Sequence, residues 1–170
     1  MAIERTGAAK EHFENAKKHY DKGVDLYPAG KDEYAKAIAE YSEVIKLLPN
    51  DAKSYASRGA CYSILEQDEK ALDDYSKAIS LDPNDEYFYT YRFNLYVKLG
   101  EMEKAVADFE KSVELAKKPE DKASKYERFG SAIMKFTGNK REAAKYYKKA
   151  IELGDDGYDS AKDALAKLGL

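Results

Sequence analysis

The sequence predicts an all-α protein built as an α-solenoid, a stack of helix pairs. Three segments end alike: AIAEYSEVIKLLPND at 37–51, ALDDYSKAISLDPND at 71–85 and AVADFEKSVELAKKP at 105–119, with first residues 34 apart. A fixed period of this length indicates a helix–turn–helix repeat that cannot bury its apolar face alone. No stretch alternates apolar and polar residues as a strand would. The charged fraction of 36%, with only 10 glycines and 4 prolines, suits helices with solvated faces.

The second unit, which starts at Ala52, shows the repeat pattern in full. Large residues stand at positions 4, 11 and 24, small ones at 8, 20 and 27, and a proline at 32: Tyr55, Tyr62, Tyr75; Gly59, Ala71, Ala78; Pro83. Small residues allow two helices to cross closely, large ones fill the gaps around them, and proline stops the second helix. This pattern resembles the tetratricopeptide repeat family, which implies a right-handed superhelix.

The resemblance extends over about residues 16–153 and predicts a single domain, 1–170, with repeats at about 16–51, 52–85, 86–122 and 123–154. The third repeat departs from the pattern at position 8, where Phe93 replaces a small residue. In the first repeat, Gly23 is placed at position 8, and two extra residues fall in the turn at 27–33. The fourth repeat has Gly130 at position 8.

Two further segments are expected to close the ends of the stack. Residues 6–15 extend the first helix, and about 156–168 form a capping helix. One face of that capping helix is apolar at helical spacing, with Tyr158, Ala161, Ala164, Leu165 and Leu168. The prediction is therefore about nine helices in total.

Composition excludes several classes of protein. The net charge of −3 provides no electrostatic footprint for nucleic acid. The single cysteine, Cys61, forms no internal disulfide and lies on an apolar stripe, so we expect a core residue. No apolar run approaches the ~20 residues of a membrane span. The N-terminus is too charged for a secretory signal, so we expect a cytoplasmic protein, although a leader or anchor removed beforehand would leave no trace.

No pattern of catalytic or metal-binding residues stands out. His12 and His19 are seven apart, which is not the HExxH spacing of zinc proteases. Neither GxGxxG nor GxxxxGK[ST] occurs, so no phosphate-binding loop is visible. Adjacent acids lie at turns and helix starts, where they complement the helix dipole. We therefore expect no enzyme, no metal and no cofactor.

The family resemblance implies a concave groove lined by the first helix of each pair, at repeat positions 2, 5, 6, 9 and 12. The partner-binding residues expected on this basis are Tyr20, Val24, Lys53, Ser57, Ala60, Tyr87, Tyr91, Asn94, Glu127 and Arg128. Tyrosine offers a large rigid contact with a hydroxyl, and asparagine can bracket a peptide amide. We expect a non-enzymatic module that binds a peptide or helix of a partner protein, with Tyr87, Tyr91 and Asn94 central. The alternative is that these tyrosines pack on neighbouring helices or face water.

Two other functional hypotheses are open to comparison. Family members that bind Hsp70 or Hsp90 C-terminal tails hold the terminal carboxylate with lysine, arginine and asparagine. At those positions this chain has Tyr20, Val24, Ser57, Tyr87 and Tyr91; starting from the second repeat instead, it has Ala56, Ala60, Tyr91, Ser124 and Arg128. Neither frame supplies the cations needed, so we expect it not to bind such tails. The second hypothesis is a self-associating scaffold, or an assembly or chaperone subunit, that uses the solenoid ends and forms a weak homo-oligomer.

Overall fold

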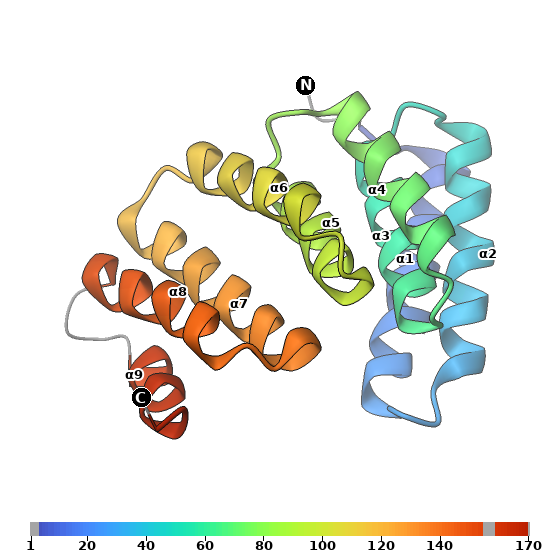
Figure 1. The fold of residues 1–170 in the computed structure, drawn as a ribbon. Coiled ribbons are helices and arrows are strands. Elements are labelled where there is room, and N and C mark those ends of the chain that lie inside the picture. The colour runs from blue at the N-terminus through green and yellow to red at the C-terminus, as the bar shows by residue number, and fades with distance from the viewer. Residues whose placement is uncertain (1–3, 155–158, 170) are drawn as a thin grey trace. The chain divides into compact units, whose positions relative to one another are not determined.

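The computed structural model describes residues 4–154 and 159–169, and all regular structure within them is helical (Figure 1). The nine helices of this described part are α1 Gly7–Asp25, α2 Lys31–Leu47, α3 Ala52–Ile64, α4 Asp68–Leu81, α5 Glu86–Leu99, α6 Met102–Leu115, α7 Pro119–Thr137, α8 Lys140–Leu153 and α9 Asp159–Lys167. The predicted all-α class, made of consecutive helix pairs, is therefore confirmed.

The helices group into two compact units. The first holds α1–α4 and ends at Asn84, and the second holds α5–α9 and begins at Asp85. This boundary lies within one residue of the predicted border between the second and third repeats. Each unit is described below by itself.

In the first unit, α1 packs on α2, α2 on α3 and α3 on α4. One cluster of its core is formed by Ala16, Tyr34, Ala37, Tyr41 and Cys61, and Val44, Ala56, Ala71, Tyr75 and Ala78 are buried as well. The buried Cys61 confirms the expected core residue, and burial raises its pKa to about 12. A buried thiol of this kind is chemically inert.

The helices of the first hairpin are longer than the repeat pattern predicts. Helices α1 and α2 have 19 and 17 residues, whereas α3 and α4 have 13 and 14. In hairpin α3–α4, a Cβ added at Gly59 would lie 2.9 Å from the ring of Tyr75, at position 24. Gly23 faces Tyr34 instead, while Tyr41, the position-24 residue, meets the ring of Phe13 at 5.6 Å. Gly23 therefore does not occupy the place predicted for it, and the extra length comes from added helical turns.

The second unit has a large aromatic core. Phe109 stacks on Phe129 with 4.4 Å between ring centroids, and Phe93 meets both rings edge-on. The whole cluster extends through α5, α6, α7, α8 and α9. Aromatic pairs in these geometries add stability beyond the area that they bury. Phe93, the departure from the repeat pattern, is thus a central core residue and is completely buried.

The end of the second unit is covered as expected. Ala161 and Leu168 are buried, and Ala164 and Leu165 pack partly on the aromatic core. The predicted start of this helix at 156 and the predicted contact of Tyr158 lie outside the described residues. At the other end of the chain, α1 includes the predicted extension from Gly7 onward.

Candidate interaction cleft

Helices α5 and α7 form the walls of an open cleft in the second unit. Helix α5 begins where Asp85 accepts a hydrogen bond from the backbone N–H of Tyr87 at 3.0 Å, and it ends at Gly100 with φ of +78°. Helix α7 begins at Pro119 and ends at Gly138, which has φ of +68°. Proline in a first turn and left-handed glycine at the end are the normal boundaries of a helix.

The two helices run in the same direction, as their cross-contacts show. The ammonium of Lys125 lies 5.2 Å from the ring centroid of Tyr87, and Arg128 acts electrostatically on Tyr91. One turn further along both helices, Asn94 and Ser131 line the same cleft. Each of these pairs is separated by 37 or 38 residues, and this constant offset places the helices side by side and parallel.

The α5–α7 cleft, as we call it, has a volume of about 430 Å³. Its lining residues come from both helices and are Asn94, Glu127, Arg128, Ser131, Ala132, Lys135 and Phe136. Three of the residues predicted from the sequence, Asn94, Glu127 and Arg128, are therefore brought together here. The exposed side chains of Tyr87 and Tyr91 precede Asn94 on α5.

Asn94 is held in place by its own helix. Its side-chain amide donates a hydrogen bond to the carbonyl oxygen of Thr90 at 2.9 Å. An asparagine amide has two hydrogens and one carbonyl oxygen, so this bond uses only one of its hydrogens. The second hydrogen and the oxygen can bind the two polar groups of a peptide unit.

The cleft combines a positive charge with an apolar end. Arg128 and Lys135 contribute two cations against the single carboxylate of Glu127. The ammonium of Lys135 lies 5.0 Å from the ring centroid of Phe136, and that ring is 38% exposed. Arginine and lysine donors suit a carboxylate, and an exposed ring suits an apolar side chain.

Burial shifts the pKa of two ionisable groups beside the cleft, Lys125 and Tyr91. It lowers the pKa of Lys125, with the carboxylate of Glu86 at 3.8 Å opposing this effect. Burial also raises the pKa of Tyr91, whereas the positive charge of Arg128 acts in the opposite direction. Lys125 is thus held between Glu86 and the ring of Tyr87 and forms part of the wall of α7.

The predicted groove residues of the first unit have varied surroundings. Tyr20 packs edge-on against Tyr34 with 5.6 Å between ring centroids, so it belongs to the hairpin core. Ser57 is hydrogen-bonded to Tyr41, whose pKa burial raises to about 12. Lys53 and Ala60 lie on α3, where Lys53 is exposed and Ala60 half-buried. Val24, in the last turn of α1, is 51% exposed.

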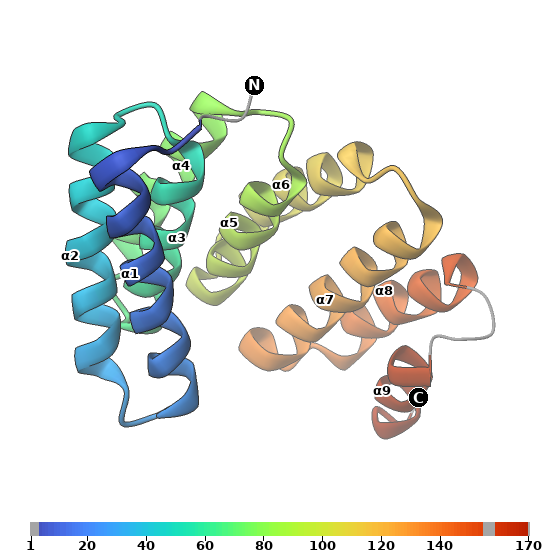
Figure 2. The same cartoon turned by 180° about the vertical axis from the view of Figure 1, so that it is seen from behind.

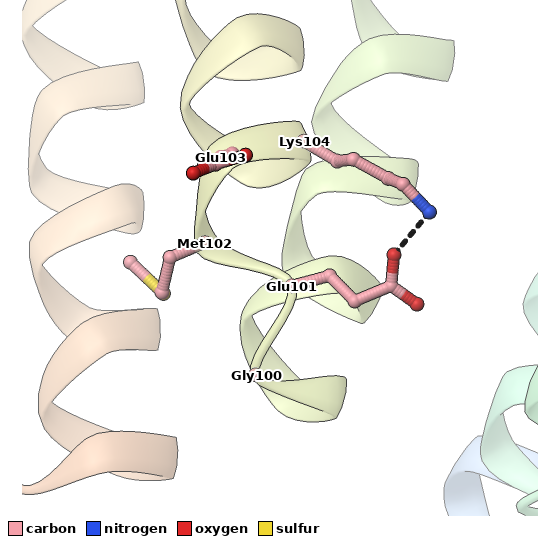
Figure 3. A pocket seen from close by; sticks show the side chains of 5 residues that line it. All are labelled: Gly100, Glu101, Met102, Glu103 and Lys104. Atoms are coloured by element: carbon pink, nitrogen blue, oxygen red, sulfur yellow. Dashed lines mark ion pairs between the residues drawn. The ribbon is translucent and has the colours of Figure 1, made fainter.

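A second depression lies at the turn between α5 and α6, with a volume of about 420 Å³ (Figure 3). The side chains of Glu101 and Lys104 form an ion pair on one side, while Met102 points the opposite way. The residues around it therefore do not converge on a common point. Among the described residues, no group of three or more His, Cys, Asp or Glu side chains could hold a metal ion.

The sequence reasoning missed Lys135 and Phe136. Lys135 follows Ser131, and Phe136 follows Ala132, by four residues or about one helical turn, so the 3.6-residue period of α7 could have identified them. It also missed the contacts of the two histidines. His12 is paired with Glu40 at 2.6 Å and His19 with Glu33 at 2.7 Å, so both histidines tie α1 to α2. Within the described ranges, no helix has the length and apolar character needed to cross a bilayer.

Comparisons with known proteins agree with the helix-pair architecture. A model of the tetratricopeptide repeat matches residues 52–85, and a second model of the same repeat matches 94–119 and 132–153. None of the curated proteins compared with this chain matches it.

Solved structures are similar over most of the chain. A crystal structure of MamA superposes with a TM-score of 0.69 at 25% identity, covering 91% of this chain and 81% of MamA. A MamA RS-1 ArsTM double mutant gives 0.70 at 17% identity, covering 96% and 94%. The first TPR of Spaghetti (RPAP3), bound to the HSP90 peptide SRMEEVD, gives 0.54 at 25% identity, covering 69% and 90%.

Proposed function

Since this chain is a tetratricopeptide repeat protein, we propose that it is a non-enzymatic interaction module whose α5–α7 cleft binds a peptide or helix of a partner protein. The repeats that match belong to a family that is generally a non-catalytic, protein-interaction fold. One observation supports the choice of site above the others: Asn94, Glu127 and Arg128, selected from the sequence, line one open cleft.

The chemistry of the cleft favours a chain with alternating polar and apolar contacts. Asn94 can pair with a backbone amide, and Arg128 can pair with an acidic side chain. Tyr91, which is 37% exposed, and Phe136, which is 38% exposed, present rings at low cost in conformational entropy. Such anchors typically dominate the binding energy of a small interface.

Chaperone tails remain a poor fit in this proposal. The similar structure of Spaghetti (RPAP3) holds an HSP90 peptide, so the comparison is direct. Capture of a terminal carboxylate needs several convergent cations, and this chain has Tyr87 and Tyr91 where the tail-binding members have lysine and arginine. A cytoplasmic location and the absence of a nucleic-acid partner likewise remain predictions from the sequence.

Association through the solenoid ends, the alternative hypothesis, gains no support from the second unit. Helix α9 covers α8 there, and the apolar side chains of Ala161 and Leu168 are buried beneath it. Terminal elements that present a polar outer face keep solenoids from stacking end to end.

Selection from a displayed library of random peptides tests the proposal. Peptides enriched on the wild-type chain should lose at least tenfold in affinity on Tyr91→Ala/Asn94→Ala, with thermal stability changed by less than ~1 kcal/mol. Lys77→Ala, at an exposed residue on α4 outside the predicted groove, is the matched control and should bind as the wild type does. The peptide SRMEEVD should bind no better than a scrambled peptide. Equal binding by wild type and double variant would reject the site.

A further inference from the structure

The tip of the first hairpin, residues 21–30, is an exposed apolar surface that the proposed function does not use. Val24 is 51% exposed, Leu26 48% and Tyr27 72%. Isolated exposed apolar side chains are common, but here three occur within four residues of the chain. Two exposed carboxylates, Asp21 and Asp25, flank this patch, and the exposed ammonium of Lys22 between them is paired with Glu33 at 3.1 Å.

The tip is a built structure with its own supports. Gly23 and Gly30 approach so closely that a Cβ added at Gly30 would lie 2.4 Å from the carbonyl oxygen of Gly23. Just behind the tip, the buried carboxylate of Glu33 accepts hydrogen bonds from Lys22 at 3.1 Å and from Lys36 at 2.9 Å. The backbone under the apolar patch is therefore fixed before any partner arrives, which reduces the entropy lost on binding.

Within the first unit, the tip also extends beyond the neighbouring turn. Helices α1 and α2 run past the α3–α4 turn, as both views of the unit show (Figures 1 and 2). The added helical turns of this hairpin thus carry the patch away from the core that α2 and α3 share.

We propose that the tip of one copy docks in the α5–α7 cleft of a second copy of this chain. Charge complementarity selects this occupant, because Asp21 and Asp25 beside apolar side chains match the two cations of the cleft beside Phe136. Leu26 and Tyr27 would contact Phe136 and Ala132, and Asp25 would pair with Arg128 or Lys135. This inference rests on the proposed function, since it names an occupant for the same cleft.

The contact has a defined symmetry. A tip and a cleft are different surfaces, so the association is head-to-tail and adds further copies unless a ring closes. Three side chains bury far less than the ~1,200 Å² of a stable interface, so the association is weak and depends on concentration.

Complementary variants test the docking directly. Leu26→Ser/Tyr27→Ser removes the tip but keeps the cleft, and Arg128→Glu/Lys135→Glu alters the cleft but keeps the tip. In sedimentation equilibrium, the wild type should show a mass that rises with concentration above the 19.2 kDa monomer, and each variant alone should remain monomeric. An equimolar mixture of the two variants should form a complex of two chains and no more, because each retains one working surface.

Matched controls separate docking from general changes of the surface. Leu47→Ser removes a leucine that is also 51% exposed but lies at the other end of α2, and it should associate as the wild type does. Arg141→Glu/Lys148→Glu reverses two exposed cations on α8 and should do the same. Circular dichroism establishes that each variant is folded.

The inference is overturned if the wild type stays monomeric, or if the mixture does. A wild type that stays monomeric and still binds library peptides through Asn94 would reject the self-docking and leave the proposed function standing. Library peptides that bind the Arg128→Glu/Lys135→Glu variant as strongly as the wild type would reject the proposed function itself.

Discussion

Hairpins α3–α4 and α7–α8 join their two helices at equivalent places with opposite chemistry. In α3–α4, the guanidinium of Arg58, just before Gly59, donates two hydrogen bonds of 2.8 Å to Asp74, just before Tyr75. In α7–α8, the residue just before Gly130 is Phe129, and the residue just before Tyr147 is Tyr146. Their rings meet edge-on with 4.7 Å between centroids.

The two kinds of side-chain pair differ in how many helices they can join. The ion pair of Arg58 and Asp74 joins α3 to α4, and the guanidinium reaches a third helix only by donating one hydrogen bond of 3.0 Å to the hydroxyl of Ser42 on α2. By contrast, the ring of Phe129 also stacks on Phe109 of α6 and meets Phe93 of α5. The cleft residue Arg128 is the neighbour of this buried ring, so the aromatic core holds one wall of the cleft in position. Hairpin α5–α6 contains both kinds of pair: Arg92 is bonded to Asp108, and the neighbouring Phe93 meets the ring of Phe109 edge-on.

The largest expected effect comes from removing the shared ring. Phe129→Ala should lower the free energy of unfolding by about 3–5 kcal/mol, because the residue is fully buried and its cavity touches three helices. Urea unfolding followed by circular dichroism measures this loss. Phe136→Ala, which removes a ring that is 38% exposed, is the control and should cost less than about 1 kcal/mol. Equal losses in the two variants would mean that the aromatic core does not support the cleft.

Breaking the ion pair should cost somewhat less. Arg58→Met leaves the buried carboxylate of Asp74 without its partner and should destabilise by about 2–3 kcal/mol. The swap Arg58→Phe/Asp74→Tyr, which copies hairpin α7–α8, should recover part of this loss in the same urea experiment. A swap that is as unstable as the single variant would show that the two chemistries are not interchangeable. Lys46→Ala, which breaks an exposed pair with Glu43, should change stability by less than about 0.5 kcal/mol.

The glycine beside each pair provides a smaller test. A methyl group at Gly59 would lie 2.9 Å from Cε1 of Tyr75, so Gly59→Ala should destabilise by about 1–2 kcal/mol in spite of the better helix propensity of alanine. Gly130→Ala should behave alike, since its Cβ would lie 3.1 Å from the ring of Tyr147. Thermal unfolding of both variants measures this. A gain in stability for either one would contradict the close packing described.

The last test concerns pH and the first hairpin. Hydrogen bonds from Lys36, His19 and Lys22 lower the pKa of Glu33 from 4.5 to about 2. The carboxylate therefore stabilises the folded state above about pH 4.5, and this contribution is lost as the pH falls towards 2. Glu33→Gln should flatten this part of the stability profile. A wild-type profile with no difference in slope from the variant below pH 4.5 would contradict the assignment.

Much of the architecture followed from the period of 34 residues, because small and large residues alternate where helices cross. The register of the first hairpin did not follow from this period. Gly23 has the spacing expected of position 8, but in the structure Tyr41 packs against Phe13, and Gly23 packs against Tyr34. A short motif fixes which residues are small but does not fix how far two helices extend. Asn94, Glu127 and Arg128 were predictable because their place in the repeat sets the direction in which they point. Tyr20 was not, because its register depended on the same misplaced glycine.

Chemical-shift mapping of the folded chain with a selected library peptide tests the central claim most directly. The account predicts that the largest amide shifts belong to residues of α5 and α7, above all Tyr91, Asn94, Arg128 and Ser131, with little change in α6 and α9. Shifts concentrated on α3 or on the outer faces of α6 and α8, with these four residues unmoved, would contradict it.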